Sequence, residues 1–329
     1  MGCAPRGALT IQRGLEDPTQ VQRVFVASNR VDPGSLTSFG SERSTVTNYG
    51  RIDLSIPENR APGSVTFPRG TVNPKTDFYS TDAVRYTSAQ AFLRAVRAER
   101  TDPRQETFVF VHGYNENLAE ASYRLAQIAW DYEVPFPAVA YDWPSAAATS
   151  GYVYDRDSVI FARDDLETLL KMLTSDGSKV ALVAHSMGSQ LVMEVLRQIA
   201  ISNSMDMSKI ASVSLVEPDI DEEVFERQAS RIPNLPQPFS IFVSAEDGAL
   251  FASSILTGRL KRLGSIRDPE KLGDLPVNVF DLTALAKRGS LNHSTLFESP
   301  AAIAQMKELL VNDELPNLAG TRVFEFKPE

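Results

Sequence analysis

Apolar runs alternate with helical stretches from residue 107 onward in this 329-residue chain, and this alternation limits the possible folds more than any other feature. Runs such as 108–111 and 180–184 lack a polar residue at every second position, so strands formed from them would be buried on both faces. Between them, stretches such as 118–132 and 191–199 repeat apolar residues at helical spacing. Buried strands joined by helices predict a mostly parallel central sheet flanked by helices.

The expected elements form one α/β core with additions at both ends. We expect a flexible segment at 1–20, strands and loops joined to the edge of the core sheet at 21–104, the core itself at 105–315, and a C-terminal tail at 316–329. Strands are expected at 24–27, 51–56, 108–111, 137–141, 180–184, 213–216, 241–243 and 277–280. Helices are expected at 88–99, 118–132 and 157–173, after residue 186, and from Ser299 and Pro300 onward. Four prolines predict an irregular connection at 57–82.

Composition excludes several classes of protein. Hydrophobic residues make up 43% of the chain and charged residues 23%, which excludes fibrous proteins and disorder throughout. The net charge of −9 argues against nucleic acid as a partner, because phosphate binding needs clustered Lys and Arg. No run approaches the roughly 18 apolar residues of a membrane-spanning helix, so no span is expected.

Cys3 is the only cysteine, which excludes an internal disulfide and a cysteine-based zinc cluster. The run Gly2-Cys3-Ala4 resembles the end of a bacterial lipoprotein signal, although the basic and apolar regions that would precede it are missing. Arg6 disfavours N-myristoylation, which needs Ser or Thr at that position. Two interpretations stay open: a trimmed lipoprotein of the cell envelope or periplasm with a lipid anchor at Cys3, or a cytoplasmic protein.

The most specific motif is Ala184-His185-Ser186-Met187-Gly188, between an expected buried strand and a helix. A sharp strand-to-helix turn would hold Ser186 in a strained conformation and expose its hydroxyl at a helix N-terminus. Small residues on both sides let the flanking backbones approach; Gly188 fits, and Ala184 replaces the usual first glycine. The pattern predicts that Ser186 is a nucleophile. The alternative is a serine that only caps the helix.

A second motif, His112-Gly113-Tyr114-Asn115, follows an earlier strand. Hydrolases with a nucleophile elbow bind the oxyanion with two backbone N–H groups, one after the nucleophile and one from such a loop. These would belong to Met187 and Tyr114. A His-Gly pair alone is weak evidence for an oxyanion loop, and its position before the elbow strengthens that evidence.

A nucleophilic serine needs a base, and the chain has three histidines. His112 lies in the expected oxyanion loop and His185 is fixed beside the nucleophile. His293 lies in a polar loop after the last expected strand, so we predict that it is the base. The alternative, a structural surface histidine, would leave the elbow without one.

The acid that orients His293 should lie between the serine and the histidine in the sequence. Asp247 follows the strand at 241–243, directly before the histidine loop, and is our preferred candidate. Asp219, after the preceding strand, is the alternative acid, and Glu246 is a weaker one.

Together these residues resemble a bacterial α/β-hydrolase family long catalogued as a domain of unknown function, over about residues 22 to 310. The segments that carry the resemblance are 110–115, 142–145, 184–188, 218–221 and 243–250. The resemblance implies an α/β-hydrolase fold and a Ser186-Asp247-His293 triad, in a carboxylesterase that works through an acyl-enzyme. It also implies an envelope location. Glu217 and Ser189 depart from the family pattern, where a small residue and Asn are more common.

Other acyl chemistries on the same triad (lipase, thioesterase or amidase) stay open, as does a catalytically silent binding protein on this scaffold. We expect a small-molecule ester substrate, no metal and no cofactor.

Several further features allow two interpretations. Trp143, Tyr152 and Tyr154 are expected either to contact the substrate or to pack in the core. Residues 155–157 begin like a calcium loop but lack its Gly and Glu, and the sequon at 292–294 is interpreted as accidental. The basic run of Arg259, Lys261, Arg262 and Arg267 is expected to be a solvated segment or part of a lid. Segments 57–82, 144–156 and 248–270 are expected to shape the substrate site.

Overall fold

The computed structural model describes residues 6–12, 20–36, 39–68, 70–102, 105–258, 261–312 and 320–328. Cys3, where one of the two open interpretations places a lipid anchor, and Arg259 of the basic run lie outside these residues. The chain divides into two compact units, unit 1 with Met1–Phe110 and Tyr114–Ser158 and unit 2 with Val111–Gly113 and Val159–Glu329. The boundaries expected from the sequence stay predictions.

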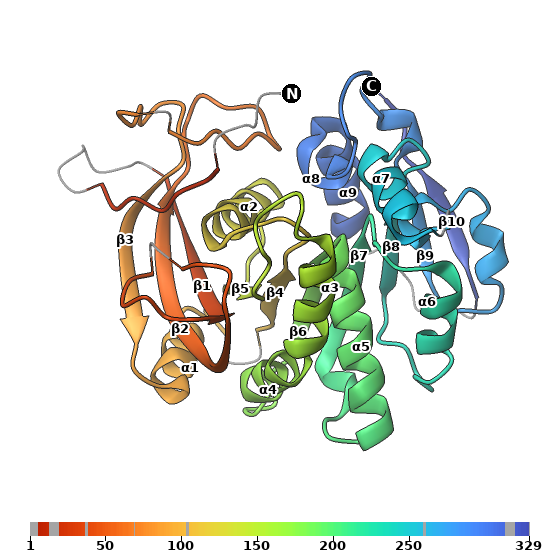
Figure 1. Ribbon diagram of the computed structural model, residues 1–329, viewed down its shortest axis with the longest axis horizontal. Helices are drawn as coiled ribbons and strands as arrows, with labels where there is room; N and C mark the ends of the chain where they lie inside the picture. Colours follow the sequence, from red (N-terminus) through yellow and green to blue (C-terminus); the bar gives the residue numbers. More distant parts are fainter. Residues whose placement is uncertain are drawn as a thin grey trace. The chain divides into compact units, whose positions relative to one another are not determined.

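Unit 1 carries the N-terminal strands (Figure 1). Its strands lie in the order β4-β5-β1-β2-β3. β1 runs parallel to β5 and antiparallel to β2, and β2 runs antiparallel to β3. The N-terminal strands therefore lie at this edge, as the sequence predicts, and their antiparallel pairing is an addition from the structure. The elements are β1 (Val21–Arg30), β2 (Arg43–Ser55), β3 (Tyr79–Tyr86), α1 (Ala89–Ala98), β4 (Thr107–Val111), α2 (Leu118–Asp131), β5 (Ala138–Asp142) and the start of α3 (Tyr152–Phe161).

The strand β3 was not expected, and its first residues fall within the connection 57–82 that we predicted to be irregular. Tyr79 and Ser80 are buried, and the rest of the strand is partly or fully exposed. An edge strand of this kind keeps many polar residues, so it lacks the apolar run that marks the central strands.

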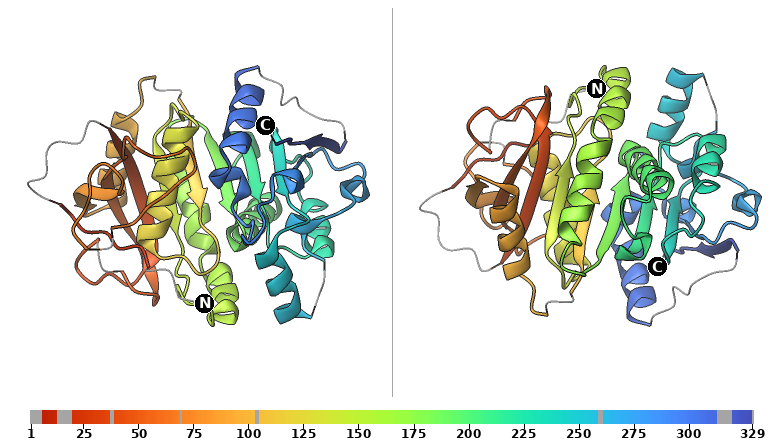
Figure 2. Two further views of the ribbon diagram at one scale, coloured as in Figure 1. Left: turned by 90° about the horizontal axis from the view of Figure 1, so that it is seen from above. Right: turned by 90° about the horizontal axis from the view of Figure 1, so that it is seen from below.

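Unit 2 contains five parallel strands in the order β10-β9-β8-β7-β6. Figure 2 shows the green helix α5 and the blue helix α9 on opposite sides of these strands. The elements are α4 (Arg163–Leu173), β6 (Val180–His185), α5 (Met187–Ser202), β7 (Ile210–Val216), α6 (Glu222–Ala229), β8 (Phe239–Val243), α7 (Gly248–Thr257), β9 (Asn278–Asp281), α8 (Thr295–Glu298), α9 (Pro300–Val311) and β10 (Arg322–Glu325).

The core of unit 2 follows from its apolar strands. β8 is buried along its whole length, and β6 and β7 are mostly buried. Phe242, Phe280 and Phe324 stack across three neighbouring strands, with successive ring centroids 4.8 Å apart. Phe324 belongs to β10, which lies in the stretch that we expected to be a tail. Ser299 accepts the Ala302 N–H at the start of α9, as its position before Pro300 predicts.

Where the chain is described, its helices are too short or too polar to cross a membrane.

Candidate active site

Ser186 lies on a sharp turn between β6 and α5. Its backbone has φ 51° and ψ −122°, a conformation that costs a non-glycine residue about 1–3 kcal/mol. Three hydrogen bonds hold the turn: the Ser186 N–H donates to the Val216 carbonyl (2.9 Å), and its carbonyl accepts from the N–H groups of Ser189 (3.0 Å) and Asp219 (3.2 Å). The predicted elbow is confirmed as backbone geometry.

Gly188 is required by the close approach of this turn to another strand end. A Cβ at position 188 would lie 2.3 Å from the His112 carbonyl oxygen and 2.6 Å from that of Val111. The side chain of Ser186 makes no capping hydrogen bond to α5, so the alternative interpretation of a helix cap is wrong. Its hydroxyl is available for another partner.

That partner is His293. The Ser186 Oγ lies 2.8 Å from His293 Nε2, and His293 Nδ1 lies 2.7 Å from Asp247 Oδ2. The other carboxylate oxygen, Asp247 Oδ1, accepts the N–H groups of Ala249 and Leu250 at 2.9 Å and so caps α7. One oxygen fixes the carboxylate and the other orients the imidazole. The structure thus brings together all three residues that the sequence predicts to be a triad.

The carboxylate of Asp247 changes the pKa of the His293 imidazole. Burial alone would lower the pKa of its imidazole, but the hydrogen bond and the charge of Asp247 outweigh burial and raise the pKa to about 9. The same interaction would stabilise the imidazolium if His293 took a proton from Ser186. The arrangement can therefore activate a hydroxyl as a nucleophile.

A family model described as an alpha/beta hydrolase of unknown function (DUF900) matches residues 87–312, more than two thirds of the chain. The chain belongs to this family. The α/β-hydrolase fold expected from the sequence is confirmed, with mostly parallel strands flanked by helices and antiparallel strands on the N-terminal side.

Several solved structures resemble this α/β hydrolase weakly. An esterase from Pyrobaculum calidifontis is 11% identical with a TM-score of 0.41, and the match covers 92% of this chain and 88% of that one. A dienelactone hydrolase from Anabaena variabilis is 14% identical with a TM-score of 0.42, covering 91% and 99%. Carboxyl esterase 2 from Tuber melanosporum is 11% identical with a TM-score of 0.42, covering 95% and 91%. No curated protein matches the sequence. These similarities are too low to bear on activity.

Two further residues of the hydrolase anchor the loop that carries His293. The His185 ring, through Nε2, lies 2.6 Å from the backbone carbonyl oxygen of His293. Glu217 Oε1 accepts the N–H of Thr295 at 3.0 Å. The histidine loop is thus held at residues 293 and 295 from the ends of β6 and β7. We did not predict either role. The one signal in the sequence was the unusual acid at position 217.

Glu217 is fully buried and has a positive φ of 46°. Burial raises the pKa of its carboxyl group to about 8, against the nearby positive charge of His293. Its second oxygen, Oε2, has no hydrogen-bond partner in the described part of the chain and lies 4.0 Å from His185 Nε2.

His185, Glu217 and His293 also place one potential metal ligand atom each within 4.8 Å of one another. A cation bound there would compete with the hydrogen bonds that these histidines already make, His293 with Ser186 and Asp247 and His185 with the His293 carbonyl.

The alternative acid, Asp219, has a different partner. Its Oδ1 lies 3.1 Å from Arg262 Nε and accepts the Ser253 hydroxyl at 2.8 Å. Glu246, the weaker candidate, is exposed. Of the three acids that we considered, Asp247 is the one at hydrogen-bonding distance from the imidazole.

The two predicted oxyanion donors, Met187 and Tyr114, belong to different units. Met187 is the first residue of α5, where backbone N–H groups have no acceptor within the helix. In unit 1, the Tyr114 hydroxyl donates to the Thr149 carbonyl at 2.5 Å. The next N–H, that of Asn115, donates to Asp155 Oδ2 at 3.1 Å and fixes the loop. Tyr114 as an oxyanion donor stays a prediction.

Asp155 and the aromatic residues of unit 1 have structural partners. Asp155 also accepts the Ser145 hydroxyl at 2.7 Å. Trp143 and Tyr152 are buried. The Tyr154 hydroxyl donates to the Ser41 carbonyl at 2.8 Å. These contacts fit the packing interpretation, and substrate contact by Trp143, Tyr152 and Tyr154 stays a prediction.

Proposed function

We propose that this hydrolase is a serine carboxylesterase that cleaves carboxylic esters through an acyl-enzyme. The proposal depends on one observation above all, the continuous line of hydrogen-bonding distances from Ser186 Oγ through His293 to Asp247, 2.8 Å and 2.7 Å. A hydroxyl, an imidazole and a buried carboxylate in this order are the groups that acyl transfer requires.

In the proposed reaction, His293 Nε2 takes the proton of Ser186 as the hydroxyl attacks the ester carbonyl. The carbonyl oxygen becomes an oxyanion. We propose the backbone N–H groups of Met187 and Tyr114 as its hydrogen-bond donors. Collapse of this intermediate breaks the bond to the alcohol, which receives the proton from His293. Water, activated by the same imidazole, then hydrolyses the acyl-enzyme and restores Ser186.

The test is hydrolysis of p-nitrophenyl esters of increasing chain length by the wild type and by Ser186→Ala. We expect kcat to fall by about 10⁴-fold or more, because the nucleophile is removed. Ser189→Ala is the matched control, because the Ser189 hydroxyl donates to the Ala184 carbonyl at 3.1 Å and, among the residues that the structure describes, forms no hydrogen bond with a triad side chain. Retained esterase activity in Ser186→Ala would contradict the assignment.

A fluorophosphonate probe separates this proposal from a catalytically silent binding protein. Covalent labelling is expected in the wild type and absent in Ser186→Ala, because only an activated serine reacts with the probe. A wild type that stays unlabelled would favour the binding protein. Labelling without turnover of any ester would favour thioesters or amides as substrates.

A further inference from the structure

Helix α7, which begins directly after Asp247, exposes its largest apolar side chains and buries two polar ones. Its largest apolar side chains face outward: Phe251 is 64% exposed, Ile255 60% and Leu256 67%. The residues that it buries are Leu250 and two serines, Ser253 and Ser254. A surface helix of a globular protein normally buries its apolar face and exposes its polar one. The reversal indicates that this face meets something other than water.

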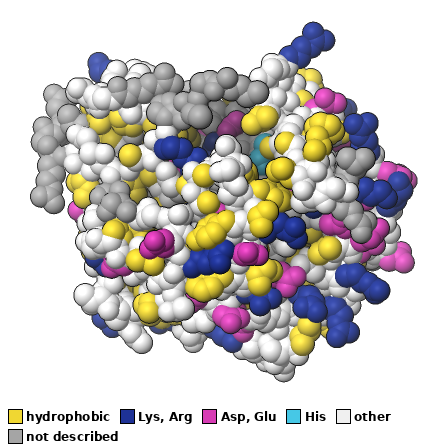
Figure 3. Space-filling view, in the orientation of Figure 1, with side chains coloured by type: hydrophobic (Ala, Val, Ile, Leu, Met, Phe, Trp, Pro, Cys, Tyr) yellow, Lys and Arg dark blue, Asp and Glu magenta, His cyan; other side chains and the backbone are white. Residues whose placement is uncertain are grey.

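The exposed apolar surface continues onto the histidine loop. Leu291 is 66% exposed, and its carbonyl accepts the Gly248 N–H at 2.8 Å, so the loop lies against the first turn of α7. We name Phe251, Ile255, Leu256 and Leu291 the α7 patch. Figure 3 shows hydrophobic side chains gathered where α7 lies, close to a histidine. Single exposed hydrophobic residues are common, whereas a contiguous group marks an interaction surface.

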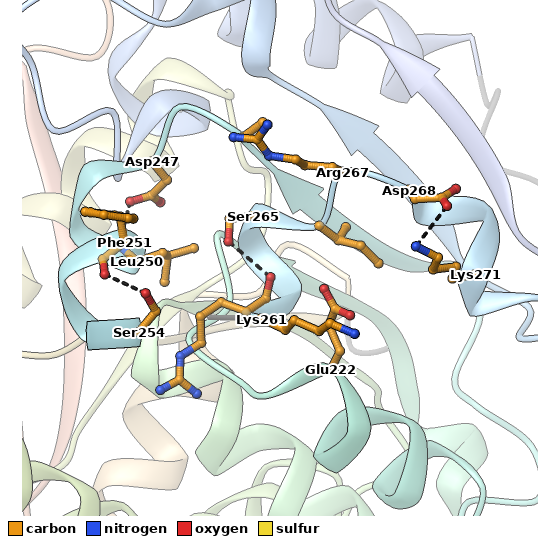
Figure 4. A pocket seen from close by; sticks show the side chains of 13 residues that line it. Glu222, Asp247, Leu250, Phe251, Ser254, Lys261, Ser265, Arg267, Asp268 and Lys271 are labelled. Atoms are coloured by element: carbon orange, nitrogen blue, oxygen red, sulfur yellow. Dashed lines mark hydrogen bonds and ion pairs between the residues drawn. The ribbon is translucent and has the colours of Figure 1, made fainter. Parts of the chain in front are cut away.

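Cationic groups flank the same helix. A cavity of about 290 Å³ lies beside α7, with Leu250 and Phe251 in one wall (Figure 4). Its cations are Lys261, Arg262, Arg267 and Lys271, and its acids are Glu222, Asp247 and Asp268.

Several of these charges are already neutralised. Arg262 pairs with Asp219, and Lys271 pairs with Asp268 at 3.0 Å. Arg267 has no ion pair with any residue that the structure describes, and in Figure 4 it extends across the cavity toward the Asp247 end of α7. Lys261 is also exposed, and its charge acts on Glu222.

We propose that the α7 patch and this cationic flank dock the protein on anionic phospholipid bilayers. The apolar side chains would enter the boundary between headgroups and acyl chains, and Arg267 and Lys261 would bind lipid phosphates. Charge complementarity favours this occupant, because four cations and three acids line the cavity beside the α7 patch, in a chain whose overall net charge is −9. In a symmetric pair of copies, the same face would bring these cations toward their own counterparts.

Docking at this face would place the proposed triad at the bilayer. Asp247 caps α7, and Leu291 precedes His293 by two residues. An ester of an amphiphilic lipid could then reach Ser186 from the membrane. This part of the inference rests on the proposed esterase function, and it names membrane-borne esters as the substrate class.

The experiment is flotation with vesicles of phosphatidylcholine alone and with phosphatidylglycerol added. We expect the wild type to float with the anionic vesicles, and Phe251→Ser/Ile255→Ser/Leu256→Ser to lose about tenfold or more of this binding. The matched control is Ile201→Ser/Val224→Ser/Leu310→Ser, three exposed apolar residues on α5, α6 and α9, and it should float like the wild type. Lys261→Gln/Arg267→Gln should lose the preference for anionic vesicles, and it tests the proposal independently if the apolar variant does not fold.

Two further measurements separate docking from catalysis. Ser186→Ala should float like the wild type, so docking is tested even if the esterase proposal fails. Hydrolysis of a soluble short-chain ester should be unchanged in both docking variants. Equal flotation of the wild type and both docking variants would overturn the proposal. So would a wild-type dimer that separates in the apolar variant, because a second copy would then be the occupant.

Discussion

The ends of β7 and β8 each carry a buried aspartate, and the two side chains have different partners. Asp219, after β7, faces Arg262, with 3.1 Å between Oδ1 and Nε. Asp247, after β8, faces His293, with 2.7 Å between Oδ2 and Nδ1. The strands are parallel neighbours, so both carboxylates follow the carboxyl ends of strands on the same side of the sheet. What distinguishes the two sites is the cation that each one meets.

A guanidinium keeps its proton throughout the physiological pH range, whereas an imidazole exchanges its proton near neutrality. The pair of Asp219 and Arg262 can therefore fix residue 262 to the end of β7, and Asp219 also binds α7 through the Ser253 hydroxyl, but the pair cannot take part in proton transfer. The pair of Asp247 and His293 can do so. Glu217, also after β7, has a third task, since it binds the backbone of the histidine loop.

The largest effect should come from Asp247→Asn. Asparagine cannot stabilise the imidazolium and can hold His293 in the wrong tautomer, so we expect kcat for p-nitrophenyl acetate to fall about 10⁴-fold. The comparison is with Asp219→Asn in the same assay. A greater loss in Asp219→Asn would reverse the assignment of the two sites.

A smaller loss is expected when the anchor of the histidine loop is removed. Glu217→Ala leaves the Thr295 N–H without its acceptor, and a displaced His293 should reduce kcat by about 10²-fold. Glu217→Gln keeps an acceptor at the same place and should stay within a few-fold of the wild type. If both variants lose activity equally, the carboxylate and not the anchoring bond is what matters.

The pH profile of Glu217→Gln tests the electrostatic part of the same contact. A negative charge at Glu217 favours the imidazolium and so contributes to the raised pKa of His293. Without that charge the pKa falls, and the basic imidazole appears at lower pH. The acidic limb of kcat/KM should therefore move to lower pH than in the wild type. A limb that stays in place or moves to higher pH would contradict this coupling.

The smallest effect on catalysis should come from Asp219→Asn, with kcat/KM within a few-fold of the wild type. Stability should fall instead, because Arg262 loses a buried carboxylate and keeps a neutral acceptor. We expect the free energy of unfolding to decrease by about 2 kcal/mol, measured by urea denaturation. Unchanged stability would show that the ion pair does not hold this edge.

The sequence predicted those parts of the site that depend on local patterns. The elbow at Ser186 needs a buried run, a sharp turn and a helix in direct succession, and all three are visible in the sequence. His293 could be assigned because only three histidines exist and two were already placed. The preference for Asp247 used the order of the strands, which helical connections make predictable.

What the sequence did not predict depends on contacts across the fold. The bond from Glu217 to Thr295 joins residues 78 positions apart, and no local pattern marks it. Helix α7 lies in the segment 248–270, which we expected only to shape the substrate site, and no helix was predicted there. Periodicity can show that a helix has two faces, but it cannot show which face is buried when the usual preference is reversed.

The backbone at Ser186 has a consequence for evolution. A left-handed conformation is strained for serine, and glycine adopts it freely, so Ser186→Gly should relieve more strain than the extra freedom of glycine in the unfolded chain costs. Thermal denaturation should then show a higher Tm for the inactive variant Ser186→Gly than for the wild type. Selection for stability alone would favour glycine at position 186. A serine kept there in related sequences would therefore indicate selection for catalytic activity.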